Sequence, residues 1–382
     1  MRFFRRVSAV MGATLVLASV ASAAEPIRIG AVLSVTGPAS LLGEPEAKVL
    51  KHHIDKMNRD GGVAGRKIDF VFYDDEGKAD KTASLVKRLI DNDKVDVIIG
   101  PTLTGNTMAA VPIVEAAQIP MISIAGGGVI VEPVKKWVFK TPHTDKMASA
   151  KVFADMKKRG ITKIALIYGT DGYGKSASAA TKEIAPEHGM TIVGDETYAP
   201  SDVDMTAQLT RIRNIAGVQA IFNLGFGQTA AIVTKNYKQL GIALPFYESH
   251  GVNSKAYINL AGVEATEGIR LPGSALLVAE ALPANDPQKA MTMQFKTEYE
   301  KTFGGEVSTY GGHAYDALII ALAAIQRAGG SDKAKVRDEI EKTSGYIGTS
   351  GVVNMTATDH LGLDLSSLRM IEIRNGNWTL VE

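Results

Sequence analysis

Short apolar runs alternate with segments of helical periodicity along most of the 382-residue chain. Apolar runs of strand length lie at 27–35, 68–75, 95–100 and 120–125. Between them, apolar residues recur at the spacing of one helix face, which predicts helices over 44–58, 78–93 and 105–117. Continuous apolar strands that alternate with amphipathic helices are typical of a parallel sheet covered by helices on both faces. The pattern therefore predicts an α/β fold.

The same alternation begins again near residue 147 and predicts a second α/β unit of similar size, without a detectable sequence repeat. Its predicted helices lie at 147–159, 174–188, 203–214 and 228–240. Its predicted strands lie at 163–169, 191–199, 220–225 and 245–249. The last third is less regular and predicts helices near 287–302, 312–328 and 332–343. Asn375-Gly376, between two alternating runs, indicates a terminal β-hairpin.

The first 24 residues have the pattern of a secretory signal peptide. Three arginines, at positions 2, 5 and 6, precede an apolar stretch from about Val7 to Val20, and small residues follow it. The stretch is short for a membrane anchor and has no charge after it, so we expect cleavage after Ala23 or Ala24 and a periplasmic location. Loss of the three arginines changes the net charge from +1 to −2, which gives no reason to expect nucleic acid as a partner.

Composition excludes several kinds of catalytic site. The chain has no cysteine, so its core alone must hold it together, and thiol catalysis and cysteine-ligated metals are excluded. HExxH, GxSxG and P-loop motifs are absent, and "GTDGYG" at 169–174 has the wrong spacing for a dinucleotide-binding turn. We expect no cofactor, no metal and no enzymatic activity.

The stretch "IGPTLTGNT" suggests where a ligand binds. A predicted strand ends at Gly100-Pro101, and a hydroxyl-rich turn opens the next helix. Parallel sheets bind ligands outside the carboxyl ends of their strands. Free N–H groups at a helix start, together with the hydroxyls of Thr102 and Thr104, would suit a carboxylate. The alternative is that Thr104 simply caps the helix.

The order and spacing of several weak motifs resemble the leucine/isoleucine/valine-binding-protein family, the periplasmic type I solute-binding proteins of ABC importers. The motifs are "IGAVLSVTGPASLLG", "NRDGGVAGRKIDFVFYDDEGKADKTASLVKRLI", "VDVIIGP", "AAVPIVEAAQIPMIS", "IYGTDGYGKS" and "HAYDALIIALAAI". The resemblance implies two Rossmann-like lobes with mostly parallel sheets, joined by a three-strand hinge. It implies one lobe from 25–142 plus 273–350 and the other from 143–272 plus 351–382.

The resemblance also implies ligand contacts. Thr104 aligns with a hydroxyl that holds the ligand carboxylate, and Ala125 with a backbone contact. Tyr173, Phe226 and Tyr310 align with aromatic contact positions, although each could equally pack in a core.

Three departures from the family pattern bear on the ligand. The first is Gly126, Gly127 and Gly128, where the amino-acid binders have a hydroxyl, and the second is Leu41-Leu42, an apolar wall in place of an aromatic residue. The third is His250, which replaces the acidic residue that pairs with the ligand ammonium, while Glu248 lies two residues earlier. A buried ammonium without a carboxylate partner would cost several kcal/mol.

These departures favour a carboxylate with a flat apolar body and no α-ammonium, such as a benzoate or phenylpropanoid acid. An apolar or branched-chain amino acid is the alternative if Glu248, rather than His250, faces the cleft. A second alternative is a sensor module of the same fold, although no fused signalling segment is evident. We expect a monomer that delivers its ligand to an ABC permease at the inner membrane.

Overall fold

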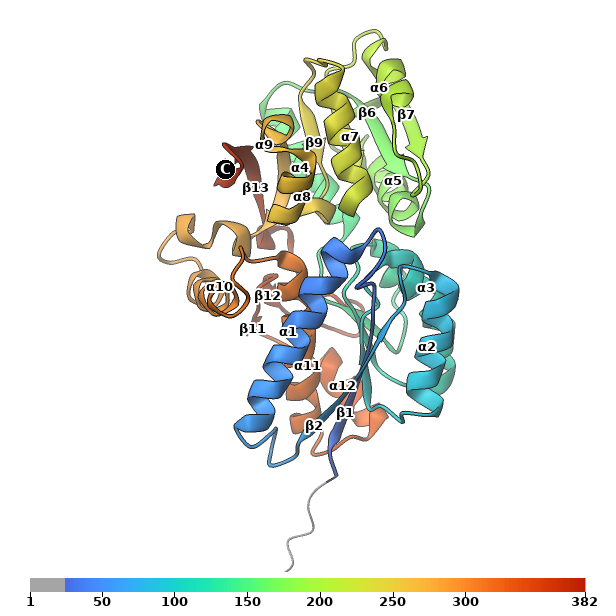
Figure 1. Ribbon diagram of the computed structural model, residues 1–382, viewed down its shortest axis with the longest axis vertical. Helices are drawn as coiled ribbons and strands as arrows, with labels where there is room; N and C mark the ends of the chain where they lie inside the picture. The colour runs from blue at the N-terminus through green and yellow to red at the C-terminus, as the bar shows by residue number, and fades with distance from the viewer. Residues whose placement is uncertain (1–24, 382) are drawn as a thin grey trace, which may run out of the picture.

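The computed structural model describes residues 25–381, and the predicted signal peptide lies outside the described residues. Two α/β lobes are stacked along the long axis of the molecule (Figure 1). Each lobe is built around its own mostly parallel sheet and its own buried apolar clusters. The predicted fold class is therefore confirmed.

The lower lobe contains a five-stranded parallel sheet in the order β2-β1-β3-β4-β5. Its strands are β1 (Ile27–Leu33), β2 (Ile68–Asp74), β3 (Val97–Ile99), β4 (Met121–Ser123) and β5 (Val138–Lys140). The helices from the first third of the chain are α1 (Ser40–Arg59), α2 (Ala79–Asp91) and α3 (Thr104–Ala117), followed by the 3-10 turn η1 (Gly128–Ile130).

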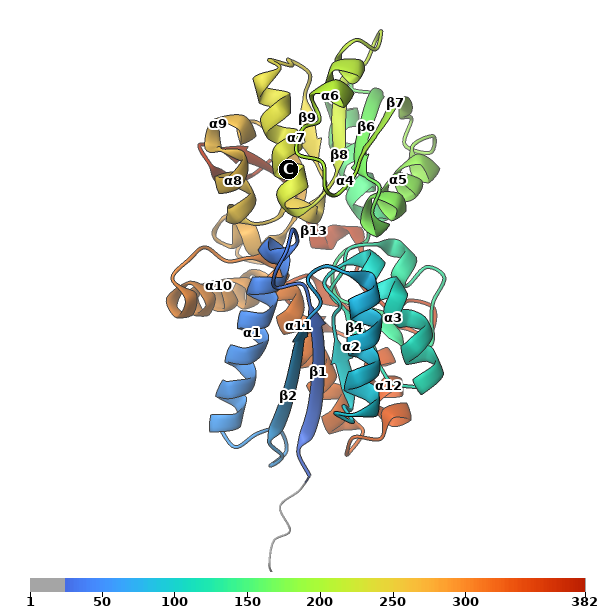
Figure 2. The same cartoon turned by 45° about the vertical axis from the view of Figure 1, so that its right-hand side comes forward.

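The C-terminal third completes this lower lobe. Helix α11 (Thr309–Arg327) packs along α1, and α12 (Lys333–Glu341) packs against α11 (Figure 2). Apolar side chains of both helices join the cluster formed around the lower sheet. Helix α10 (Lys289–Phe303) and the short strands β11 (Tyr346–Ile347) and β12 (Val352–Val353) lie beside them.

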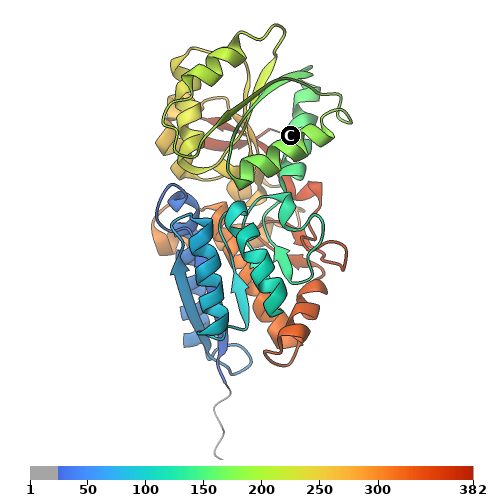
Figure 3. The same ribbon diagram turned by 90° about the vertical axis from the view of Figure 1, so that its right-hand side faces the viewer.

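The upper lobe contains a seven-stranded sheet in the order β14-β13-β10-β9-β8-β6-β7. The strands from β7 to β10 in that order are parallel, whereas β13 and β14 run antiparallel at one edge. The strands are β6 (Lys163–Gly169), β7 (Thr191–Tyr198), β8 (Ala220–Leu224), β9 (Phe246–Glu248), β10 (Arg270–Ser274), β13 (Leu368–Arg374) and β14 (Asn377–Leu380). The helices are α4 (Asp145–Lys158), α5 (Gly172–Ile184), α6 (Thr206–Arg213), α7 (Gly227–Gln239), α8 (Lys255–Ala261) and α9 (Val263–Thr266), with the 3-10 turn η2 (His250–Val252) (Figure 3).

Both the expected terminal hairpin and the helical elements are present, with shifted ends. Asn375 and Gly376 have φ values of 49° and 72°, the left-handed geometry that a two-residue hairpin turn needs, which confirms that prediction. Helix α1 begins at Ser40, four residues before the predicted start at 44. The apolar run after β10 is not a longer strand, because the 3-10 segment η3 (Ala275–Ala281) turns it away from the sheet.

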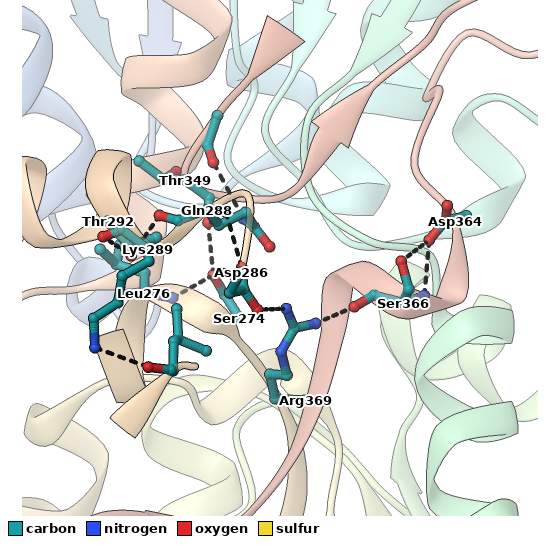
Figure 4. Close-up of polar contacts among 12 residues, drawn as sticks. Ser274, Leu276, Asp286, Gln288, Lys289, Thr292, Thr349, Asp364, Ser366 and Arg369 are labelled. Atoms are coloured by element: carbon teal, nitrogen blue, oxygen red, sulfur yellow. Dashed lines mark hydrogen bonds and ion pairs between the residues drawn. The ribbon is translucent and has the colours of Figure 1, made fainter. Parts of the chain in front are cut away.

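Polar contacts join segments of the chain near the junction of the two lobes (Figure 4). Ser274, at the end of β10, donates its hydroxyl to the carbonyl of Thr349 at 2.8 Å. Arg369, in β13, donates to a carboxylate oxygen of Asp286 at 2.7 Å, and both side chains are largely buried. Each of these two bonds joins a residue at or soon after the second crossing between the lobes, Ser274 or Asp286, to a residue from the last part of the chain.

The lobe boundaries taken from the family resemblance stay a prediction. The apolar side chains of Met355, Leu361 and Leu363 belong to the core of the lower lobe. The next strand, β13, belongs to the upper sheet. We therefore propose that the third passage lies between Leu363 and Leu368, later than the division after residue 350.

Candidate functional site

A small cavity lies between the two lobes, at the carboxyl ends of strands from both sheets. It has a volume of about 40 Å³. The side chains that line it come from both lobes: Leu42, Thr102, Leu103, Thr104, Ile124, Gly126, Pro142, Tyr173, Phe226, His250, Gly251, Tyr310 and His313. The structure thus brings most of the predicted ligand contacts to one place.

Thr104 is the first residue of α3, and its side chain does not cap the helix. Its Oγ1 instead accepts the N–H of Gly127 at 3.1 Å, across the cavity wall. The capping alternative is therefore wrong. Because the oxygen already accepts one bond, the hydroxyl hydrogen is the part of Thr104 available to a ligand.

Thr102 lines the cavity, but its hydroxyl is committed to the protein interior. It donates to Glu46 at 2.5 Å and accepts the backbone N–H of Ser34 at 3.0 Å. Burial raises the pKa of the Glu46 carboxyl well above its usual range, while the bond from Thr102 opposes that shift. Thr102 therefore offers a ligand its methyl group and main chain rather than a free hydroxyl.

Two predicted contacts do not line the cavity. The N–H of Ala125 is bonded to the Ser123 hydroxyl at 3.3 Å, and the N–H of Gly127 is bonded to Thr104. A Cβ on Gly127 would lie only 2.4 Å from a carbon of Thr104, so no side chain fits there. Between these two residues, Gly126 lines the cavity.

The upper lobe contributes an aromatic wall. The ring of Tyr173, at the start of α5, meets the ring of Phe226 edge-on with centroids 5.8 Å apart. It meets the imidazole of His250 in the same way at 5.9 Å. Such edge-to-face pairs hold the rings in fixed orientations. Together with Leu42 from the lower lobe they make most of the cavity wall apolar.

His250 faces the cavity and Glu248 does not. The Nε2 atom of His250 is buried and has no hydrogen-bond partner in the described part of the chain. The Glu248 carboxylate lies in the upper core, where it accepts bonds from Asn223, Thr234 and Tyr257 at 3.0–3.1 Å. Burial raises the pKa of Glu248 to about 8. No acidic side chain of residues 25–381 lines this cavity.

The lobes touch around the cavity in two further places. The Tyr310 hydroxyl donates to the carbonyl of Gly251 at 2.7 Å, which joins α11 to the turn after β9. On the other side, Gly172 of α5 lies so close to Gly105 of α3 that a Cβ on Gly172 would be 2.6 Å from the Gly105 Cα. The two lobes are therefore in contact beside the cavity.

Basic groups surround the buried end of the cavity. Burial lowers the pKa values of His250 and His313 to about 3, so both imidazoles are neutral at physiological pH. His313 donates to, or accepts from, the Ser350 hydroxyl at 2.7 Å. Sequence reasoning missed His313, although it lies three residues after the predicted contact Tyr310, on the same face of α11.

A second cavity adjoins the first and shares Leu103, Thr104, Tyr173 and Phe226 with it. It has a volume of about 160 Å³. Its lining includes two acidic residues, Glu76 and Asp171. Asp171 is engaged as the cap of α5, since its carboxylate accepts the N–H groups of Tyr173 and Gly174.

Away from the cleft, His52, His53 and Glu298 place potential metal ligands within 4.8 Å of one another. Lys56 already donates to the Glu298 carboxylate at 2.6 Å, which neutralises the charge that a metal would need. The expectation that the chain holds no metal stays a prediction. Among the described residues, the helices are too short or too polar to cross a bilayer.

Comparison with known proteins identifies the family. The family model described as "Periplasmic binding protein" matches residues 26–376. The chain belongs to the periplasmic binding protein family.

Relatives in this family are distant but match over most of their length. One is the leucine-, isoleucine-, valine-, threonine- and alanine-binding protein of Pseudomonas aeruginosa, 25% identical over 96% of this chain and 92% of its own. Another is Leu/Ile/Val-binding protein homolog 3 of Brucella melitensis, 25% identical over 85% of each chain. The resemblance inferred from the motifs is therefore confirmed.

Solved structures agree with the fold. An extracellular ligand-binding receptor from Rhodopseudomonas palustris HaA2 has a TM-score of 0.86, with 29% identity over 93% of this chain and 99% of its own. The LivJ protein of Streptococcus pneumoniae, solved in complex with isoleucine, has a TM-score of 0.82 and 24% identity over 94% and 99%. The family is one of extracytoplasmic ligand-binding proteins, and this chain is one of them.

Proposed function

We propose that this protein is the ligand-binding component of an ABC importer and that it closes its two lobes on a small carboxylate. The observation that carries the proposal is the cavity that is lined from both lobes by the predicted contact residues. A ligand that touches both walls favours the closed arrangement through contacts absent from the open one. Delivery to a permease at the inner membrane, export by the N-terminal signal peptide and a monomeric state belong to the same proposal.

The contacts at the cavity support distinct roles for its residues. The Thr104 hydroxyl donates to the carboxylate, while Tyr173, Phe226 and Leu42 enclose an apolar body. His250 offers the other end of the ligand an imidazole with an unpaired Nε2. Ala125 and Gly127 support the wall from behind, Thr102 lines it with its hydroxyl turned to Glu46, and Tyr310 joins the two lobes.

The first candidate ligand is an apolar amino acid. The names of the relatives support it, because they bind leucine, isoleucine or valine among others. They favour this alternative over the aromatic acid that the sequence departures suggested, and nothing in the comparisons supports an aromatic acid.

The second candidate is an acid without an α-ammonium, and one specific observation favours it. No carboxylate among the described residues lines the cavity, and Glu248 is already bonded in the core. An α-ammonium bound here would lie beside neutral imidazoles and apolar rings, which costs several kcal/mol unless oxygen atoms surround it.

Calorimetry with three probes separates the candidates. L-Leucine and 4-methyl-2-oxopentanoate share a carbon skeleton and a carboxylate and differ only in an ammonium or a keto group; benzoate is the flat acid. Tighter binding of leucine would support the first candidate, and tighter binding of either acid the second. If none of these nor valine, isoleucine or glutamate binds at millimolar concentration, the proposed ligand class is wrong.

A further inference from the structure

Lys140 is a fully buried lysine at the end of β5, with no exposed surface. Its Nζ donates to the carbonyl oxygens of Gly126 at 2.9 Å and His143 at 3.3 Å. No ion pair joins this ammonium to a carboxylate in the described residues, whereas other largely buried cations, such as Arg270 and Arg369, are paired. A buried cation that no carboxylate contacts directly is costly, and proteins keep few of them.

The position of Lys140 connects it with the ligand cavity. Gly126, whose carbonyl accepts from Nζ, lines that cavity. The main chain of Gly126 therefore separates Lys140 from the cavity, on the side where His250 and His313 also lie. A Cβ on Gly126 would be 2.8 Å from the His250 Nε2, so a larger residue at position 126 would separate these groups.

We propose that Lys140 selects ligands of net negative charge for this cavity. The proposal rests on the proposed function and decides between its two candidates. A monoanionic acid adds a negative charge near the buried ammonium, which no carboxylate of the described residues contacts directly. A zwitterionic amino acid brings its own cation into the same cavity and gains little from Lys140. Lys140 acts through Gly126 and its electric field, so it is a positioning residue rather than a direct ligand contact.

The groups facing Lys140 define the pH range in which this selection is visible. The carboxyl groups of Asp145 and Glu132 attract the ammonium, and the imidazoles of His143, His250 and His313 oppose it. Burial lowers the pKa values of these imidazoles far below neutrality, so they carry no charge above pH 6. Asp145 is held by the N–H of Gly128 and the hydroxyl of Ser176.

Burial also lowers the pKa of Lys140 to about 7. A bound anion favours the ammonium form and raises this pKa, whereas the free protein loses the proton above pH 7. Below pH 7 the lysine is charged in both states and anion affinity is at its full value. Above pH 7, binding must take up a proton, so affinity falls by up to about tenfold per pH unit.

The experiment measures the binding of 4-methyl-2-oxopentanoate and leucine from pH 6 to pH 8.5 in four proteins: the wild type, Lys140→Met, Lys140→Arg and Lys135→Met. Lys135 is the matched control, because it also donates to two backbone carbonyls, those of Val129 and Pro133, but outside the cavity. In the wild type, the keto acid should lose about 30-fold in affinity over this range, while leucine changes by less than about threefold.

Lys140→Met should weaken the keto acid about tenfold to a hundredfold at pH 6, because it removes a positive charge whose attraction for the anion is only partly screened inside the protein. Its pH profile should be flat, and leucine should change little. Lys140→Arg should keep keto-acid affinity with a flat profile, because arginine does not titrate in this range. Lys135→Met should match the wild type.

Three outcomes would overturn the proposal: an unchanged keto-acid affinity in folded Lys140→Met, equal losses for leucine and keto acid, or a flat wild-type profile. The last of these needs no variant, so the test survives a variant that fails to fold. If leucine binds and Lys140→Met has no selective effect, only this inference fails. If no probe binds the wild type, the proposed function fails with it.

Discussion

A close approach of the two lobes at Gly172 and Gly105 predicts a substitution that impairs closure without harming either lobe. Gly172 opens α5 in the upper lobe and faces Gly105 of α3 in the lower one. An alanine Cβ at 172 would lie 2.6 Å from the Gly105 Cα and 2.7 Å from its nitrogen. Ordinary contact begins near 3.4 Å, so the lobes would have to part by roughly 0.8 Å.

The magnitude follows from the nature of the clash. Both partners are backbone at helix starts and cannot swing aside, so the overlap should cost the closed state about 1–3 kcal/mol. The open state carries no such cost. Gly172→Ala should therefore weaken ligand binding roughly fivefold to 150-fold, since only the closed state holds the ligand with both walls. The ligand-free melting temperature should be unchanged or slightly higher, because alanine favours helix more than glycine does.

Gly105→Ala is the matched control. Its Cβ would lie 3.7 Å from the Gly172 Cα, an ordinary contact, so binding should stay within about twofold of the wild type. Calorimetry with whichever probe binds the wild type gives the affinities, and small-angle scattering with and without that probe reports closure. Wild-type affinity in Gly172→Ala, or an equal loss in Gly105→Ala, would show that this contact does not limit closure.

Three further predictions concern single side chains. Thr104→Ala should weaken binding by about 1–3 kcal/mol, because a carboxylate oxygen loses its donor; an unchanged calorimetric affinity would remove Thr104 from the site. His250→Glu should improve leucine relative to 4-methyl-2-oxopentanoate, and a constant ratio of the two affinities would contradict the ligand argument. The raised pKa of Glu248, about 8, implies stability that is full below pH 4.5 and falls by up to about 1.4 kcal/mol per pH unit as the pH rises to 8. Glu248→Gln should flatten that part of the urea-unfolding profile, and a slope equal to that of the wild type would mean that Glu248 is not the group responsible.

The fold could be predicted from the sequence because each buried parallel strand must be apolar along its whole length. β1 and β8 are buried almost throughout, and all but one residue of each, Arg28 and Asn223, are apolar or glycine. The ends of helices were less predictable, because they depend on tertiary contacts that the local sequence pattern does not show. The early start of α1 at Ser40 is such a case.

The orientation of side chains at the site could not be predicted in the same way. Glu248 and His250 are two residues apart and would share one face if β9 continued. The strand ends at Glu248, and the Ser249 side chain accepts the N–H of Gly251, which starts a 3-10 turn and separates them. Hydrophobic periodicity shows which face of a strand is apolar. It does not show, to within two residues, where the strand ends.

Lys140 shows a second limit. A lysine at the end of a short strand suggests a solvated loop, yet the Gly126 and His143 main chain closes over it. Those partners come from segments on either side of β5, and their approach depends on how the loop after β4 meets the start of α4. Burial of this kind is a tertiary property and leaves no pattern in the local sequence.

Neither lobe is encoded by one continuous stretch of chain. The buried face of α1 is covered by α11, more than 240 residues later, and the upper sheet gains β13 and β14 only from the final segment. During synthesis, which starts at the N-terminus, the chain lacks part of both cores until its last third has been made. Contacts between residues so far apart in sequence form slowly. Truncation after residue 272 would therefore disrupt both halves of the molecule at once, and neither half could be produced as a simple N- or C-terminal fragment.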